Sequence, residues 1–315
     1  MLKCAGGASM GFKKKYCDIK NFIKDDLDFL EQEIKNLFKS KSPLDKDLSD
    51  FLTAPAKRLR PVLGFLFLRS LFNEINPAQR DVMLAVELIH NATLIHDDVI
   101  DKAEKRRNQK AFNAKFDDNL AVVAGDFLLS VAMEKIINTG SVEVIKICTS
   151  ALKTTCLGEI SQHFSKFRIT SIDEYIEKSK EKTALLFQIA ALGGLLLSQN
   201  PSEELKQTAI DFSQNFGIAF QIRDDLINIL NSELPNNDVN SGIYTAPVIF
   251  AYQENNNILK EKNIAEMVKK TKGIEKTRDL MDNYFAKSIS AIEKFEDNVY
   301  KKAIIELVEI LKTNL

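Results

Sequence analysis

Apolar residues recur along almost the whole chain at the spacing of an α-helix, and this pattern limits the possible folds more than any other feature. Ile19, Ile23 and Leu27, for example, fall on one side of a helix. Strand-like alternation is hard to find, and only 7 prolines and 12 glycines punctuate the 315 residues. The sequence therefore predicts an all-α fold in which outer helices wrap a central bundle. The expected helices cover residues 18–39, 60–72, from Pro77 into the segment near residue 97, 119–138, 142–164, 171–197 and 202–230.

The composition excludes several classes of function. Lys and Arg number 43 against 44 Asp and Glu, so no global field recruits nucleic acid or an anionic membrane. The apolar run 184–197 is too short to span a bilayer, and a secretory signal pattern is absent. The 4 cysteines show no CxxC pair, which favours free thiols in a reducing cytosol. We expect one cytoplasmic domain over residues 1–315, with 1–11 disordered or tag-like.

Two acidic clusters interrupt apolar helical segments, at residues 94–101 and 220–228. Carboxylates on one face of a helix repel each other unless a cation lies between them. Mg²⁺ takes oxygen ligands and often shares them with substrate phosphates. One such cluster is usually a helix cap or a solvated turn, but two favour a metal site. The carboxylates are Asp97, Asp98 and Asp101 in the first cluster and Asp224 and Asp225 in the second.

Basic residues accompany both acidic clusters. Each alone is most simply a solvated surface charge, but Arg clamps phosphate through its planar fork and Lys acts as a point charge. Carboxylate pairs rimmed by such cations are what a diphosphate bridged by Mg²⁺ requires. The residues concerned are Lys57, Arg58, Arg60, Arg106, Arg107 and Lys182.

From about Pro55 to Pro247 the motifs follow the order and spacing of one enzyme family. The segment 55–61 resembles the Gly-Gly-Lys-Arg-x-Arg-Pro block of the trans-polyprenyl diphosphate synthases, and 97–101 resembles their first DDxxD motif. Any one block is weak, but together they are specific, and they resemble the long-chain, octaprenyl-like members. The resemblance implies a helical bundle of the isoprenoid synthase type with a central cavity. Other matching blocks are Glu87-Leu-Ile-His90, Arg106-Arg107, Gly125-Asp126-Phe127-Leu128, Gly158-Glu159-Ile-Ser-Gln162, Lys182-Thr183-Ala184 and Phe220-Gln221.

The resemblance also implies a reaction and roles for individual residues. A homodimeric prenyltransferase would join isopentenyl diphosphate to an allylic diphosphate such as farnesyl diphosphate, with three Mg²⁺ ions per site. The allylic carbon–oxygen bond would ionise, and the double bond of isopentenyl diphosphate would attack the cation. His96 is better suited to a structural role than to a base. The expected metal ligands are Asp97, Asp101 and Asp224; the expected catalytic residues also include Asp98, Arg106 and Lys182; Thr183 and Gln221 would attend the allylic substrate; and Lys57, Arg60, His90 and Arg107 would hold isopentenyl diphosphate.

The chain departs from the family pattern in several places. Pro55 and Ala56 replace two glycines, and the second acidic motif ends in Asn228, a weaker ligand than Asp. Two lysines that relatives carry beyond that motif are missing, near Glu233 and Ile243. Their loss leaves open a catalytically weak regulatory subunit of a heteromeric synthase. A terpene cyclase is a further alternative, although it would have little use for the basic block at 55–61.

Product length in this family depends on what blocks the tunnel beneath the first aspartates. Ala92 and Thr93 lie one helical turn below Asp97, and both are small. We therefore expect a long-chain product, with Met133 as a candidate floor of the tunnel. Two alternatives stay open: the small residues could merely allow close helix packing, and the enzyme could be a short-chain farnesyl or geranylgeranyl synthase.

Overall fold

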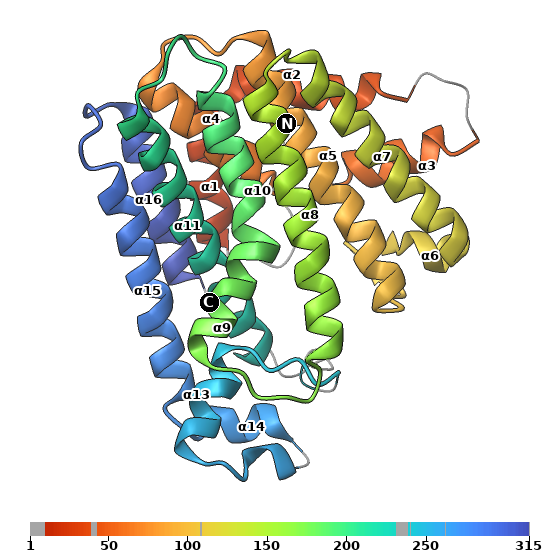
Figure 1. Cartoon of the computed structure of the whole chain (residues 1–315), viewed down its shortest axis with the longest axis vertical. Helices are drawn as coiled ribbons and strands as arrows, with labels where there is room; N and C mark the ends of the chain where they lie inside the picture. The colour runs from red at the N-terminus through yellow and green to blue at the C-terminus, as the bar shows by residue number, and fades with distance from the viewer. Residues whose placement is uncertain are drawn as a thin grey trace. The chain divides into compact units, whose positions relative to one another are not determined.

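The computed structural model describes residues 10–38, 43–107, 109–230, 239, 241–261 and 263–314. These residues are helical over most of their length, and the strands among them form one short hairpin (Figure 1). The all-α prediction is confirmed. Two compact units share the chain. Unit 1 comprises Met1–Cys148, Ile189–Ser202 and Phe295–Glu306, and unit 2 comprises Thr149–Gln188, Glu203–Lys294 and Leu307–Leu315. The expected single domain stays a prediction.

Unit 1 is built around the long helix α5. This helix packs against α7, and its other neighbours include α2, α4 and the π-helical segment η2 (Figure 1). Most residues of α4 are buried, and α5 is buried without interruption from Val82 to Ile89, as their apolar sequences predict. The elements are α1 (Met10–Asn21), α2 (Lys24–Asn36), α3 (Asp45–Thr53), α4 (Leu59–Leu71), α5 (Pro77–Ile100), β1 (Lys105–Arg106), β2 (Gln109–Lys110), α6 (Phe112–Lys115), α7 (Asp118–Asn138), the start of α8 (Val142–Phe164), η2 (Ile189–Gly193) and the start of α16 (Val299–Thr313).

The N-terminal helix expected over 18–39 is two helices. The backbone leaves helical geometry at Ile23, with φ −123° and ψ 30°, and α2 starts one residue later. Ile19 and Ile23 are both buried, so the apolar spacing continues through the break and does not reveal it. Helix α1 begins at Met10, inside the segment expected to be disordered. Cys17 is disulfide-bonded, which the expectation of free thiols missed because spacing in sequence does not report proximity in space.

Helix α5 has clear signals at both of its ends. Asn76 and Gln79 form a capping box, and Pro77 opens the helix, as the sequence predicts. Beyond Ile100 the polar stretch forms the hairpin β1–β2, in which Arg106 is paired with Gln109. The hairpin region places Arg106 and Arg107 against α5, where they bind Asp98 and Asn91.

Unit 2 is organised around α11, which packs against α15 and against the π-helical segment η1 (Figure 1). A side chain at Gly217 would place its Cβ 2.4 Å from the Cα of Ala184, so only glycine allows this close approach. The helix expected over 171–197 is interrupted by π-turns, which apolar spacing does not distinguish from α-helix. The elements are the remainder of α8, α9 (Ile172–Ser179), η1 (Lys180–Ala184), α10 (Leu185–Gln188), α11 (Glu203–Leu230), α13 (Ala246–Glu254), the 3₁₀ segment η3 (Ile258–Lys260), α14 (Ile264–Lys269), α15 (Gly273–Ala291) and the end of α16.

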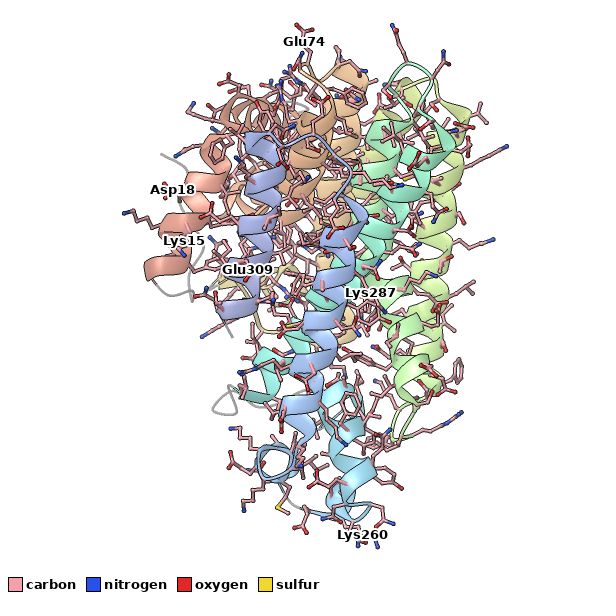
Figure 2. The ribbon with its side chains drawn as sticks, turned by 90° about the vertical axis from the view of Figure 1, so that its left-hand side faces the viewer. Lys15, Asp18, Glu74, Lys260, Lys287 and Glu309 are labelled. Atoms are coloured by element: carbon pink, nitrogen blue, oxygen red, sulfur yellow. The ribbon has the colours of Figure 1, made fainter. Side chains whose placement is uncertain are left out.

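Charged side chains lie on the outer faces of the helices. Lys15 and Asp18 of unit 1, and Lys260 and Lys287 of unit 2, are exposed and labelled in Figure 2. None of the helices that the structure describes combines the length and the apolarity needed to cross a membrane.

Candidate active site

The acidic end of α5 carries the first predicted metal ligands. Asp97 is half-buried, and Asp101, the C-cap residue, is exposed and donates its amide to the Asp97 carbonyl over 2.8 Å. Two carboxylates at a helix end suit Mg²⁺, which retains water and takes substrate phosphate oxygens. The described residues hold no group of three His, Cys, Asp or Glu side chains placed to bind a metal. The donor set therefore fits an ion that arrives with a phosphate ligand.

Asp98 points into the protein and binds Arg106. Its side chain is fully buried, and Oδ1 accepts hydrogen bonds from Nε of Arg106, at 2.9 Å, and from Nη2. Arg106 lies in the hairpin that follows α5 and is partly exposed. Asp98, predicted to be catalytic, thus fixes the guanidinium of a predicted phosphate-binding residue, and its own carboxylate is enclosed.

A buried ion pair lies behind the basic segment 55–61. Arg58 donates from Nη1 to Oε1 of Glu87, at 2.8 Å, and from Nε to Oε1 of Glu31, at 2.9 Å. The side chains of Arg58 and Glu87 are 2% and 1% exposed, respectively. Burial alone lowers the pKa of Arg58, but Glu87 and Glu31 outweigh it, and the net shift is upward. Arg58 therefore acts as a permanent internal cation that anchors the basic segment to α5.

The same carboxylate is connected to Arg107. Asn91, one turn beyond Glu87 on α5, donates to Oε1 of Glu87 over 3.0 Å and accepts from Nη2 of Arg107 over 3.1 Å. The Arg107 guanidinium also lies over the ring of Phe51, at 5.5 Å from its centroid. Arg58 and Arg107 both have positive φ, 57° and 51°. Such backbone strain often marks functional segments, and here the shared contacts around Glu87 sustain it.

His90 lies within this group of cations. Burial lowers the pKa of His90 most, followed by the charges of neighbouring arginines. The imidazole therefore stays neutral at pH values well below the usual pKa of a histidine. The backbone of the basic segment 55–61 is held by Tyr16, whose hydroxyl donates to the Lys57 carbonyl over 2.9 Å. Three of the four predicted isopentenyl diphosphate residues, Arg60, His90 and Arg107, therefore belong to one electropositive cluster. The arginines that lower the His90 pKa are, in decreasing order, Arg60, Arg107, Arg106 and Arg58.

Unit 2 gathers the residues predicted to attend the allylic substrate. Thr183, in η1, donates to Oε1 of Gln221 over 2.5 Å, and Gln221 donates to Oδ1 of Asp225 over 2.9 Å. Tyr175 donates to the other oxygen of Asp225 over 2.6 Å. The π-turn and the second acidic motif are thus connected by one chain of hydrogen bonds. Asp225 is buried and saturated by these donors, which leaves Asp224 as the accessible carboxylate of the motif.

Asp224 and Lys182 are both partly exposed and both have ionic neighbours. Asp224 is 45% exposed and lies 3.2 Å from Nη1 of Arg223. Arg223 is buried, and its other nitrogens donate to the carbonyls of Leu311 and Asn314 in the C-terminal segment. Lys182 donates to Glu159 over 2.8 Å. Asn228 is exposed, and Glu233 lies outside the described residues.

The predicted chain-length residues lie on two packed helices of unit 1. Ala92 is fully buried on α5, and Thr93 is half-buried with its hydroxyl bonded to the His90 carbonyl. Met133 is half-buried on α7. His96 contacts α7 through the Val122 carbonyl, at 3.2 Å, in keeping with the structural role expected for it. The functional role of each of these residues stays a prediction.

Most of the polar residues that hydrogen-bond the candidate site residues were not predicted from the sequence. Glu31 lies far from any motif and gives no signal. Asn91 was detectable, since Glu87 and Asn91 are polar residues one turn apart in the largely apolar middle of α5. Tyr175 gives no pattern that separates it from a core aromatic.

The neutral state of His90 predicts a specific acid sensitivity. Unfolded His binds a proton below a pH of about 6.5, whereas folded His90 does not, so this residue makes the free energy of unfolding fall as the pH falls. Its contribution between pH 6.5 and 5.5 is at most about 1.4 kcal/mol. Urea unfolding at several pH values should show a steeper acid loss for the wild type than for His90→Gln. Parallel losses in the two proteins would contradict a neutral His90.

Comparisons with known proteins identify the chain's family. Residues 41–284 match the family described as polyprenyl synthetase. A prenyl transferase from Cyanidium caldarium is 31% identical over 305 residues, which cover 90% of this chain and 94% of that protein. Heptaprenyl diphosphate synthase component 2 from Bacillus subtilis is 30% identical over 303 residues, covering 90% and 85%. The structure of a polyprenyl synthase from Caulobacter crescentus, complexed with calcium and isoprenyl diphosphate, superimposes with a TM-score of 0.86 at 25% identity and covers 95% of this chain and 97% of that one. The chain therefore belongs to the polyprenyl synthetase family and is a prenyltransferase, as its motifs predict.

Proposed function

We propose that this prenyltransferase elongates an allylic diphosphate, such as farnesyl diphosphate, with isopentenyl diphosphate to give a long-chain all-trans polyprenyl diphosphate. The observation that carries the proposal is the electropositive cluster of unit 1, in which arginines surround a neutral His90. Asp97 follows His90 on the same helix by about two turns. One helix thus carries both a diphosphate-binding histidine and the start of a metal-binding motif.

Isopentenyl diphosphate would bind through its diphosphate to Lys57, Arg60, His90 and Arg107. Arg107 is held by Asn91, so its guanidinium is oriented before the substrate arrives. The neutral imidazole of His90 can donate one N–H to a phosphate oxygen without adding a further buried positive charge. This arrangement holds the homoallylic double bond in place while the allylic partner reacts.

The allylic diphosphate would bind through Mg²⁺ ions held by Asp97, Asp101 and Asp224. Mg²⁺ bound by these carboxylates would neutralise charge on the leaving diphosphate. Arg106, held by Asp98, and Lys182 would stabilise the same charge as the carbon–oxygen bond breaks. The isopentenyl double bond then attacks the allylic carbon to form the new carbon–carbon bond. Loss of one proton to the released diphosphate restores a double bond in the product.

A second candidate function is that of one subunit in a heteromeric synthase. Two features favour it: the resemblance implies a lysine where Ile243 stands, and a relative is named component 2 of a heptaprenyl diphosphate synthase. The outer face of α7 could bind another subunit, since Val122, Val123 and Phe127 are 42%, 59% and 41% exposed. We favour a second copy of this chain as the partner, because the first acidic motif and its arginines are complete.

The decisive test is an elongation assay of the purified protein. We expect incorporation of labelled isopentenyl diphosphate into a polyprenyl product in the presence of farnesyl diphosphate and Mg²⁺. Asp97→Ala should lower kcat by about a hundredfold or more, because it removes a ligand that stabilises the leaving group. Asp118→Ala, a change at an exposed aspartate of α7, is the control and should retain activity.

Absence of elongation by the wild type, or elongation insensitive to Asp97→Ala, would overturn the proposal. Activity that appears only on addition of a homologous subunit would support the heteromeric alternative.

The chain-length assignment predicts a shorter product from variants at the floor of the site. Thr93→Phe and Ala92→Phe should each end elongation several isoprene units earlier, because the ring occupies space that the growing chain needs. Mass spectrometry of the dephosphorylated product measures the shift. Because Ala92 is fully buried, thermal unfolding must first show that its variant folds. An unchanged product length from folded variants at both positions would refute the assignment.

A further inference from the structure

Unit 2 contains a pocket whose charge is strongly positive. Its described lining includes four cationic side chains and one carboxylate, that of Asp225. Asp225 accepts hydrogen bonds from Gln221 and Tyr175, and its single negative charge leaves the cations of the lining in excess. Such a pocket suits a polyanion. The cations are Lys166, Arg168, Lys178 and Lys182.

Two of these cations come from the turn that joins α8 to α9, here called the 165–168 turn. Its backbone is well defined: the Arg168 amide donates to the Ser165 carbonyl over 3.3 Å, and Phe167 has φ 62°. Lys178 of α9 donates to the Ser165 hydroxyl over 2.9 Å. The turn is therefore attached to the next helix, and its cations are held at the pocket.

The turn is also attached to the segment beyond the second acidic motif. The Phe167 amide donates to the Gly242 carbonyl over 2.8 Å. Gly242 has φ +77°, and a Cβ there would lie 2.7 Å from the ring and the amide nitrogen of Phe167. Only glycine fits this contact. As a result, the next residue, Ile243, lines the pocket together with Lys166 and Arg168.

This contact relates the turn to a departure in sequence. The family resemblance implies a lysine where Ile243 stands, and Ile243 brings no charge to the pocket. The 165–168 turn brings positive charge to the same pocket from a different part of the chain. Among the described residues, Arg168 of this turn has a weak acidic partner: the Arg168–Glu174 ion pair is 3.7 Å long, and its side chains are 70% and 50% exposed.

We propose that Lys166, Arg168 and Lys178 bind the diphosphate of the allylic substrate and replace the lysine lost at position 243. The inference rests on the proposed function, because the pocket also contains Lys182 and Gln221, the residues expected to attend that substrate. These three cations are binding residues, and they take no part in proton transfer. Lys178 exchanges its bond to Ser165 for a phosphate oxygen, and Arg168 leaves its exposed partner Glu174.

A binding measurement with an unreactive substrate analogue tests this inference. Isothermal titration of the full chain with farnesyl S-thiolodiphosphate and Mg²⁺ gives the affinity without turnover. Arg168→Ala and Lys178→Ala should each weaken binding about tenfold, since a charged hydrogen bond to phosphate is lost, and the double variant Lys166→Ala/Arg168→Ala should weaken it further. Arg168→Lys keeps the charge and should restore most of the affinity.

Lys180→Ala is the matched control. Lys180 lies two residues from Lys178 but does not line the pocket, and its nearest carboxylate, that of Glu177, is 3.9 Å away. This variant should bind the analogue like the wild type. Wild-type affinity in the Arg168 and Lys178 variants would overturn the inference and leave the proposed function intact. Failure of the wild type to bind the analogue at all would overturn both.

Discussion

The buried ion pair between Arg58 and Glu87 is the interaction on which the basic half of the site depends. Taking two charges out of water is costly, and removal of one partner from such a pair typically costs 3–5 kcal/mol. Here the Arg58 guanidinium also donates to Glu31, and the Glu87 carboxylate also accepts from Asn91. Because Asn91 in turn accepts from Arg107, the pair also orders Arg107. The basic segment 55–61 and the hairpin β1–β2 are thereby fixed to α5. The strained backbone of both arginines is held by the same network.

Each of the two compact units contains some of the predicted site residues. Unit 1 contains the cation cluster around His90 and the first acidic motif, whose buried member Asp98 orients Arg106. Unit 2 contains a hydrogen-bonded chain from Thr183 to Tyr175 that saturates Asp225. In both motifs one aspartate is enclosed and positions its neighbours, and another stays accessible to a cation. Each acidic motif therefore pairs one buried aspartate with a more exposed one, and the exposed ones are the predicted metal ligands.

Sequence patterns predicted most of the helices, the roles of the candidate site residues stay predictions, and the failures have physical causes. The break at Ile23 is hidden because apolar spacing continues across it. The π-turns of 180–193 are hidden because they bury the same residue types as an α-helix. Motif residues such as Asp97 and Arg107 can be recognised in the sequence from their spacing. The residues that orient them, such as Glu31 and Tyr175, come from distant segments, and only the folded structure brings them together.

In the proposed mechanism, the network around Glu87 orients cations toward the diphosphate of isopentenyl diphosphate. Glu87→Gln keeps the size of the side chain and removes its charge, which loosens Arg58 and, through Asn91, Arg107. The most direct measurement is the pair of KM values of this variant for the two substrates. Our account predicts that KM for isopentenyl diphosphate rises about tenfold or more while KM for the allylic diphosphate stays near the wild-type value. Equal changes in both constants, or no change in either, from a folded variant would contradict it.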